Sequence, residues 1–98
     1  MSYRIKLTPQ ARHDIRRLYD FLAEKDVKSA TRSRAILQSA FETLKLFPYS
    51  CRKVDYSDPT LRELLIPFGR GGYAAIFRIR DREIRILAIR HQLEDDYL

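Results

Sequence analysis

The sequence predicts an α+β fold in which an antiparallel helical hairpin packs on one face of a small sheet. Three observations indicate this fold. Residues 3–7 alternate between apolar and basic side chains, which is typical of a half-buried strand. Two longer stretches then carry apolar residues at helical spacing, with a short break between them. The last third of the chain holds three short apolar runs divided by turn residues, which predicts a three-stranded antiparallel meander.

The first helix is expected to begin at Thr8-Pro9, because threonine is a good N-cap and proline suits the first helical position. Its apolar stripe consists of Ala11, Ile15, Leu18 and Leu22, and Tyr19 widens it. The basic residues of this segment lie largely off the stripe, at Arg12, His13, Arg16 and Arg17. They form either a solvated helix face, which is the commoner case, or a face toward a polyanion.

The second helix follows a break at residues 23–26 and is capped by Asp26 or Ser29. It ends before Pro48, because proline cannot continue a helix. Two amphipathic helices joined by a short loop form an antiparallel hairpin, and the sheet is the only candidate to cover both apolar stripes. The stripe of this second helix consists of Ala30, Ser33, Leu37, Ala40, Phe41, Leu44 and Phe47.

Residues 48–59 are expected to form a loop, and strands are expected at residues 61–66, 73–79 and 84–89. The segment between the first two strands holds all three glycines of the chain and Arg70. A hairpin turn that needs positive φ angles explains these glycines better than a phosphate-binding nest clamped by Arg70. The last strand is apolar on both of its faces, which predicts a central position in the sheet.

Length and composition bound the class of protein. The chain has 98 residues and is 45% hydrophobic, so residues 1–98 are expected to form one globular domain. No apolar run approaches the ~20 residues that span a bilayer. The start of the chain lacks the apolar region of a signal peptide. The lone Cys51 suits a reducing compartment, and a cytoplasmic location is therefore expected.

The net charge of +6 restricts the possible partners. A basic domain binds nucleic acid, an anionic membrane surface or an acidic protein, unless the charge merely solvates its surface. The basic residues are 14 arginines and 5 lysines. This excess of arginine favours planar, bidentate contacts to phosphate or carboxylate groups.

Catalytic and metal-binding motifs are sparse. His13, His91 and Cys51 have no ligand spacing, so no metal or other cofactor is expected. No triad of nucleophile, base and acid is apparent. Metal-free phosphodiester cleavage remains open, because it needs only cations, a base and an acid. The residues able to supply those roles are Arg62, Arg78, Arg90, His91 and Tyr97. A lone histidine that closes a strand, as His91 does, is more often a structural group, and Arg62 can equally be structural beside Glu63.

Three segments resemble the ParE/RelE superfamily of bacterial toxins from type II toxin–antitoxin systems. Residues 3–15 resemble its opening strand and first helix, and residues 44–48 resemble the end of its second helix. The closing strands match in the runs RELLIPFGRGGY, from Arg62, and ILAIRHQ, from Ile86. The resemblance covers nearly the whole chain and implies the same order of strand, helical hairpin and meander.

The resemblance implies two alternative targets. RelE-type members are ribosome-dependent endonucleases that cut mRNA, whereas ParE-type members poison DNA gyrase. The two runs in the closing strands look more like the ParE branch, which implies a gyrase poison that acts by contact and not as an enzyme. If the chain is instead a RelE-type ribonuclease, its catalytic candidates are Arg62, Arg90, His91 and Tyr97.

The resemblance also implies an acidic antitoxin that wraps this basic toxin into a hetero-oligomer, and it implies no membrane partner. Opposite charges would speed the association of the two proteins. The candidate residues for binding an acidic partner or the target are Arg12, Arg16, Arg62, Arg70, Arg78 and Arg90.

Overall fold

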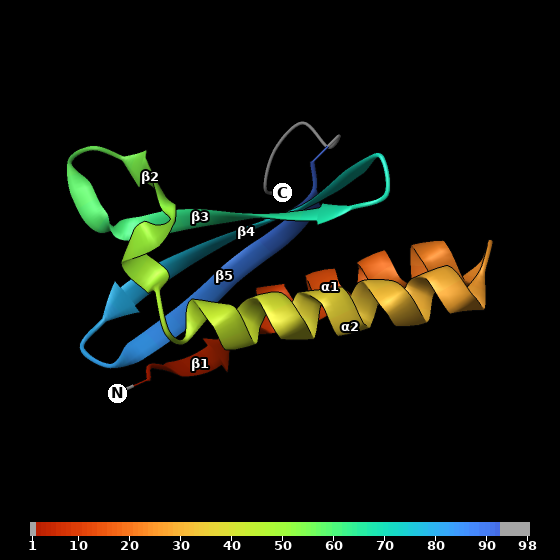
Figure 1. Cartoon of the computed structure of the whole chain (residues 1–98), viewed down its shortest axis with the longest axis horizontal. Coiled ribbons are helices and arrows are strands. Elements are labelled where there is room, and N and C mark those ends of the chain that lie inside the picture. The colour runs from red at the N-terminus through yellow and green to blue at the C-terminus, as the bar shows by residue number, and fades with distance from the viewer. Residues whose placement is uncertain (1, 93–98) are drawn as a thin grey trace.

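The computed structural model describes residues 2–92 as two helices and a five-stranded sheet (Figure 1). The predicted α+β class is confirmed. The strands lie side by side in the order β1-β5-β4-β3-β2. β1 runs parallel to β5, and the other neighbours are antiparallel. The elements are β1 (Arg4–Leu7), α1 (Pro9–Ala23), α2 (Val27–Leu44), the 3₁₀ turn η1 (Pro48–Ser50), β2 (Arg52–Asp55), β3 (Asp58–Phe68), β4 (Gly71–Arg80) and β5 (Glu83–His91).

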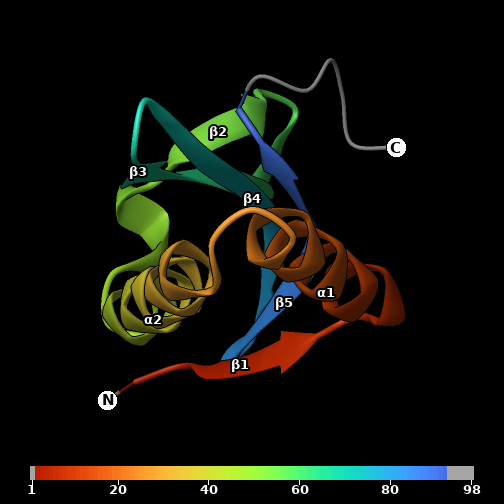
Figure 2. The same ribbon diagram turned by 90° about the vertical axis from the view of Figure 1, so that its right-hand side faces the viewer.

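Both helices begin at side-chain caps, as the sequence predicts. The Thr8 hydroxyl oxygen accepts a hydrogen bond from the Ala11 amide at 3.1 Å, and an Asp26 carboxylate oxygen accepts one from the Lys28 amide at 3.0 Å. The hairpin that follows lies on one face of the sheet (Figure 2). There α1 packs over β5, and α2 packs toward β3. No helix within residues 2–92 is long and apolar enough to cross a membrane.

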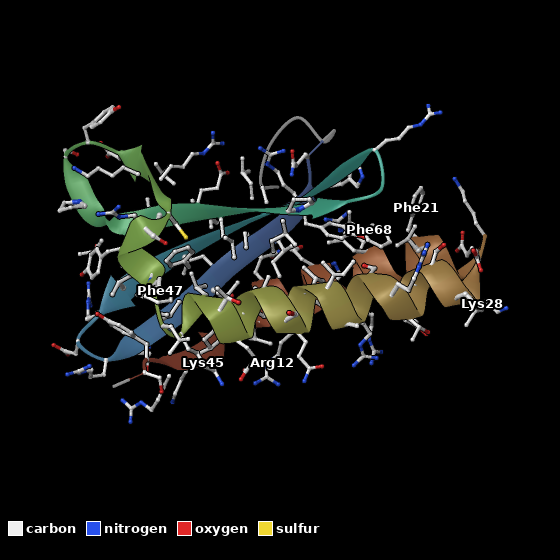
Figure 3. The ribbon with its side chains drawn as sticks, in the orientation of Figure 1. Arg12, Phe21, Lys28, Lys45, Phe47 and Phe68 are labelled. Atoms are coloured by element: carbon white, nitrogen blue, oxygen red, sulfur yellow. The ribbon has the colours of Figure 1, made fainter. Side chains whose placement is uncertain are left out.

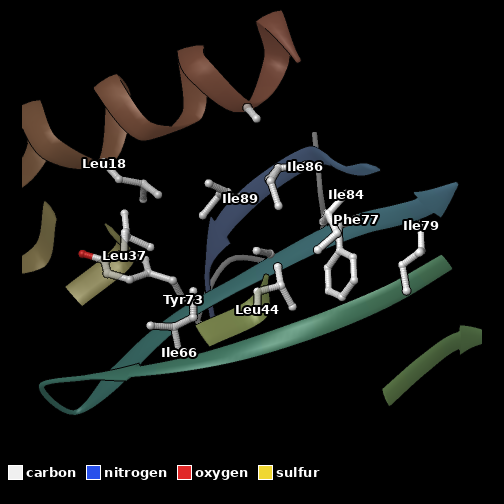
Figure 4. Close-up of a cluster of buried hydrophobic side chains, with 12 residues drawn as sticks. Leu18, Leu37, Leu44, Ile66, Tyr73, Phe77, Ile79, Ile84, Ile86 and Ile89 are labelled. Carbon is white, nitrogen blue, oxygen red and sulfur yellow. The ribbon is translucent and has the colours of Figure 1, made fainter. Parts of the chain in front are cut away.

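The hydrophobic core lies between the helical hairpin and the sheet (Figure 4). Leu18, Leu37 and Leu44 come from the helices and are at most 5% exposed. Burying an aliphatic or aromatic side chain of this size contributes about 1.5–3 kcal/mol. The sheet supplies the largest fully buried side chains, which are Tyr73, Phe77, Ile79, Ile84, Ile86 and Ile89.

The last strand, β5, is central, as its apolar pattern predicts. A register shift within it explains why that pattern occupies both parities. Ile86 and Ala88 pair with consecutive residues of β4, so Leu87 between them is an extra residue, as in a β-bulge. The shift turns Ile89 toward the helices, on the side where Ile84 is also buried.

Residues 48–59, expected to be a loop, contain η1, β2 and the start of β3. All four residues of β2 are exposed at the sheet edge, so no apolar alternation marks this strand. This strand forms by pairing with β3, and the pattern of apolar and polar residues within β2 does not predict that pairing. The placement of Phe47 on the apolar helix stripe is also wrong. This residue follows the end of α2 and is 63% exposed (Figure 3).

Candidate functional site

The candidate catalytic residues lie on opposite faces of the sheet. One face is covered by the helical hairpin, and the other, termed here the open face, carries no helix within residues 2–92. Residues paired across neighbouring strands share a face. Arg62 and His91 pair with Phe77 and Tyr73, which belong to the core, and so lie on the helix side. Arg90 precedes His91 in the strand and lies on the open face.

Arg62 binds the backbone of the segment that leads into β2. Its Nε atom donates to the Pro59 carbonyl at 2.8 Å, and its Nη1 atom donates to the carbonyls of Cys51 at 2.8 Å and Tyr49 at 3.2 Å. Its guanidinium carbon also lies 5.1 Å from the Tyr49 ring centre. In this arrangement Arg62 fastens η1 and the start of β2 to β3.

Replacing Arg62 by alanine is expected to lower the free energy of unfolding by about 1–2 kcal/mol, because three carbonyls lose a charged donor. Lysine is expected to restore only part of this loss, since one ammonium does not reproduce the guanidinium fork. Urea denaturation measures the change. Arg70→Ala, in the exposed β3–β4 turn, is the control and is expected to stay within about 0.5 kcal/mol of the parent. Equal stability of Arg62→Ala and Arg70→Ala would exclude the fastening role.

His91 packs at the end of the core. Its ring meets the Tyr73 ring edge-on, with 5.8 Å between the centres. It also lies against Gly71, where an added Cβ atom would come within 2.9 Å of His91 Cε1. The neighbouring Arg90 donates from Nη1 to the carbonyls of His91 at 3.2 Å and Gln92 at 3.3 Å. Tyr97 lies outside the described residues.

Three of the candidate catalytic residues, Arg62, Arg90 and His91, do not surround one point. The strand partners of Arg62 and His91 are four residues apart on β4, a separation of about 13 Å along the strand. Arg90 lies on the other face. General acid–base catalysis requires its groups within hydrogen-bond reach of the same reacting atoms. In this structure these three side chains are not brought together at one point.

The candidate contact arginines fall into separate regions. Arg12 and Arg16 border a hollow of about 530 Å³ beside α1, together with Arg34 from α2. Arg70 is exposed in the β3–β4 turn. The candidates therefore offer several contact surfaces and not one combined site.

The open face gathers four arginines at one end of the sheet. Arg78, a candidate from the sequence, borders a hollow of about 280 Å³ there with Arg4, Arg80 and Arg85, which no sequence pattern distinguished. The Arg78 guanidinium forms an ion pair with Asp58 at 3.0 Å. The alternation of each strand was visible in the sequence, but the pairing of β1 with β5, which brings Arg4 to this hollow, was not.

The titratable groups near β2 do not resemble a catalytic centre. Burial raises the pKa of the Cys51 thiol, and the nearby Arg62 opposes that change only in part. Hydrogen bonds from Thr60, supported by Arg78, lower the pKa of Asp58. A raised thiol pKa keeps Cys51 protonated at neutral pH and makes it a poor nucleophile. Within residues 2–92, no three side chains of histidine, cysteine, aspartate or glutamate cluster as a metal site would require.

Comparison with known proteins shows that the chain is a small toxin of the ParE/RelE superfamily. Residues 5–96 match the family model of the ParE toxin of the type II toxin–antitoxin system parDE, and the chain belongs to that family. The chain is 32% identical to the toxin RelE1 of Caulobacter vibrioides, over 96% of this chain and 98% of the relative. It is 30% identical to the toxin RelE3 of the same organism, over 92% of this chain and 95% of the relative.

Two solved structures share the fold. A chain of the chromosomal ParDE system of P. aeruginosa superposes with a TM-score of 0.73 at 22% identity, covering 95% of this chain and 98% of that one. A chain of the RelBE2 toxin–antitoxin complex of Mycobacterium tuberculosis gives a TM-score of 0.60 at 19% identity, covering 93% and 99%. The family match and the relatives confirm the resemblance to the ParE/RelE superfamily that the three sequence segments indicate.

Proposed function

We propose that this toxin is a ParE-type poison of DNA gyrase that acts by contact and has no catalytic step of its own. One observation carries the proposal: the three candidate catalytic side chains are used in structural contacts away from one another. Arg62 and Arg90 donate hydrogen bonds to backbone carbonyls, and the His91 ring packs against Tyr73. The match of residues 5–96 to the ParE family model supports the same branch. Such a toxin would meet gyrase in the cytoplasm.

The proposal includes a cognate acidic antitoxin. The solved relatives are named as toxin–antitoxin systems, and the charge of +6 suits an acidic partner. Attraction between the opposite charges speeds the encounter, and the tight complex keeps the toxin silent. The exposed arginines, among them Arg12, Arg16 and Arg70, are the proposed points of contact.

The test is a supercoiling assay with purified gyrase and relaxed plasmid. Adding the toxin is expected to reduce supercoiling, and adding the antitoxin first is expected to prevent the effect. The control for DNA cleavage by the toxin itself is the same plasmid with toxin but without gyrase, and this plasmid should stay intact. If supercoiling is unchanged at a large excess of active, folded toxin, the gyrase proposal is wrong.

A second candidate is a RelE-type mRNA endonuclease that works on the ribosome. The names of the relatives RelE1 and RelE3 favour it. Its catalytic set would be Arg62, Arg90, His91 and Tyr97. Primer extension on mRNA after brief expression tests this candidate, because cutting in the ribosome produces new ends spaced by codons. The absence of new ends in growth-arrested cells counts against it.

Replacing His91 by phenylalanine separates the two candidates. Phenylalanine keeps a ring against Tyr73 but removes both nitrogens, so a gyrase poison is expected to remain toxic with at most about 1 kcal/mol lost in stability. A ribonuclease that uses His91 would lose toxicity, since removing a general acid or base costs about 10²–10⁴-fold in rate. Growth after induction measures toxicity. His13→Phe, exposed on α1, is the matched control.

A further inference from the structure

Three neighbouring strands bring four arginines together on the open face of the sheet. The register places Arg78 of β4 beside Arg85 of β5, and Glu83 of β5 beside both Arg80 and Arg4. Side chains paired in this way stand on the same face. They border a hollow of about 280 Å³ near the β4–β5 turn, whose lining is Arg4, Arg78, Arg80, Asp81, Glu83, Arg85 and Leu87.

The hollow has more positive than negative charge available for a ligand. Two of its arginines already have carboxylate partners: Arg85 lies 2.9 Å from Glu83, and Arg78 lies 3.0 Å from Asp58. Within residues 2–92, Arg4 and Arg80 form no ion pair, and both are exposed. These two guanidinium groups are therefore positioned to bind an external anion, although Asp81 also borders the hollow and offsets part of their charge.

The lining argues against a protein segment as the main ligand. Stable protein interfaces bury an apolar or aromatic anchor at their centre, and of the described part of the chain only Leu87 brings an apolar side chain to this hollow. The large apolar side chains that are exposed within residues 2–92 lie elsewhere: Phe21, Val27, Leu46, Phe47, Tyr49, Val54, Tyr56 and Leu65.

The lining also argues against single-stranded nucleic acid. Proteins that hold single strands stack the bases on aromatic side chains, and no aromatic residue among residues 2–92 borders the hollow. Contact with a duplex through its phosphates needs only cations that are spaced over a surface. The guanidinium group suits this task because it binds phosphate oxygens in a planar, bidentate way.

We propose that this hollow binds the phosphate backbone of duplex DNA, with Arg4 and Arg80 as the principal contacts. The binding is independent of sequence. It goes beyond the gyrase proposal and does not depend on it, because it is a property of the toxin alone. If gyrase is the target, the open face would contact the DNA held by that enzyme.

The test titrates a fluorescent mixed-sequence DNA duplex of about 20 bp with the purified toxin, without gyrase, from about 50 to 200 mM salt. The logarithm of the binding constant is expected to fall against the logarithm of the salt concentration with a slope of about −2 to −4. The Arg4→Ala/Arg80→Ala variant is expected to bind about tenfold more weakly at the lowest salt, with a slope less steep by about 2. The Arg4→Lys/Arg80→Lys variant keeps both charges and should retain the slope.

The matched control is Lys28→Ala/Arg32→Ala, which removes the same two charges from the exposed surface of α2. Lys28 lies where α2 begins, at the opposite end of the molecule from the β4–β5 turn (Figures 1 and 3). This control is expected to keep the affinity within about threefold. Thermal melts establish that each variant is folded.

Equal losses in the two alanine variants would mean that net charge alone attracts DNA, and they would overturn the proposal. Tighter binding of single-stranded RNA than of the duplex would also overturn it. So would displacement of the duplex by a stoichiometric poly-glutamate peptide, or the absence of salt-dependent binding. Because gyrase is left out, failure here and failure of the supercoiling assay are separate results.

Discussion

Replacing Gly72 by alanine is expected to lower the free energy of unfolding by about 3 kcal/mol, the largest effect of any substitution proposed here. Gly72 has a φ angle of +125°, a conformation that residues with a side chain rarely adopt. An added Cβ atom would overlap the Ile66 carbonyl oxygen and lie 2.9 Å from the Phe68 nitrogen. Both are backbone atoms of the paired strand, so relief requires the end of the β3–β4 hairpin to move.

Urea denaturation of Gly72→Ala measures this effect, and Gly69→Ala is the matched control. Gly69 also has a positive φ angle, of +62°, but no heavy atom lies within 4 Å of an added Cβ. Its substitution is expected to cost about 1–2 kcal/mol for the left-handed conformation alone. If both variants lose the same stability, close backbone approach at Gly72 is not the cause.

Replacing Asp14 by alanine is expected to cost about 2–3 kcal/mol, because a buried backbone donor loses its partner. The Asp14 side chain is 3% exposed on α1. One carboxylate oxygen accepts a hydrogen bond from the Ile89 amide at 2.9 Å, and the other accepts one from Gln10 at 2.9 Å. Ile89 lies beyond the last residue of β5 that pairs with β1, and Asp14 supplies the acceptor there.

Thermal or urea unfolding of Asp14→Ala and Asp14→Asn distinguishes a hydrogen-bonding role from a charge role. Asparagine keeps an acceptor for the Ile89 amide and is expected to recover about half of the loss. Asp20→Ala, on the exposed side of the same helix, is the control for removing a negative charge from α1. An Asp14→Ala protein as stable as the Asp20→Ala protein would show that the contact contributes little.

Most of the fold follows from local patterns in the sequence. The caps at Thr8 and Asp26 and the apolar stripes define the helical hairpin, and the apolar content of β5 predicts its central place. The edge strand β2 could not be predicted in this way, because none of its four residues is buried and it forms by pairing with β3. The extra residue Leu87 could not be predicted either. Residues 86–89 are all apolar, so their sequence does not show which of them is the bulged residue.

The candidate site was less predictable than the fold. Alternation assigns arginines to the same face of one strand, but it does not say which strands become neighbours. The parallel pairing of β1 with β5 joins residues about 80 positions apart, and it alone brings Arg4 to the hollow lined by Arg80. The buried role of Asp14, by contrast, could have been predicted from the sequence. Asp14 stands three residues after Ala11 and four before Leu18, within the buried stripe of α1, where a carboxylate requires a hydrogen-bonding partner.

We propose that this toxin acts on gyrase and carries no nuclease chemistry of its own. The most direct measurement is the amount of linear plasmid released by denaturant from reactions that contain gyrase, ATP and increasing amounts of toxin. Linear DNA is expected to rise with toxin, to require gyrase, and to rise equally with the His91→Phe variant. Unchanged linear DNA, together with toxin-dependent cutting of ribosome-bound mRNA that His91→Phe abolishes, would contradict the gyrase proposal and establish the ribonuclease instead.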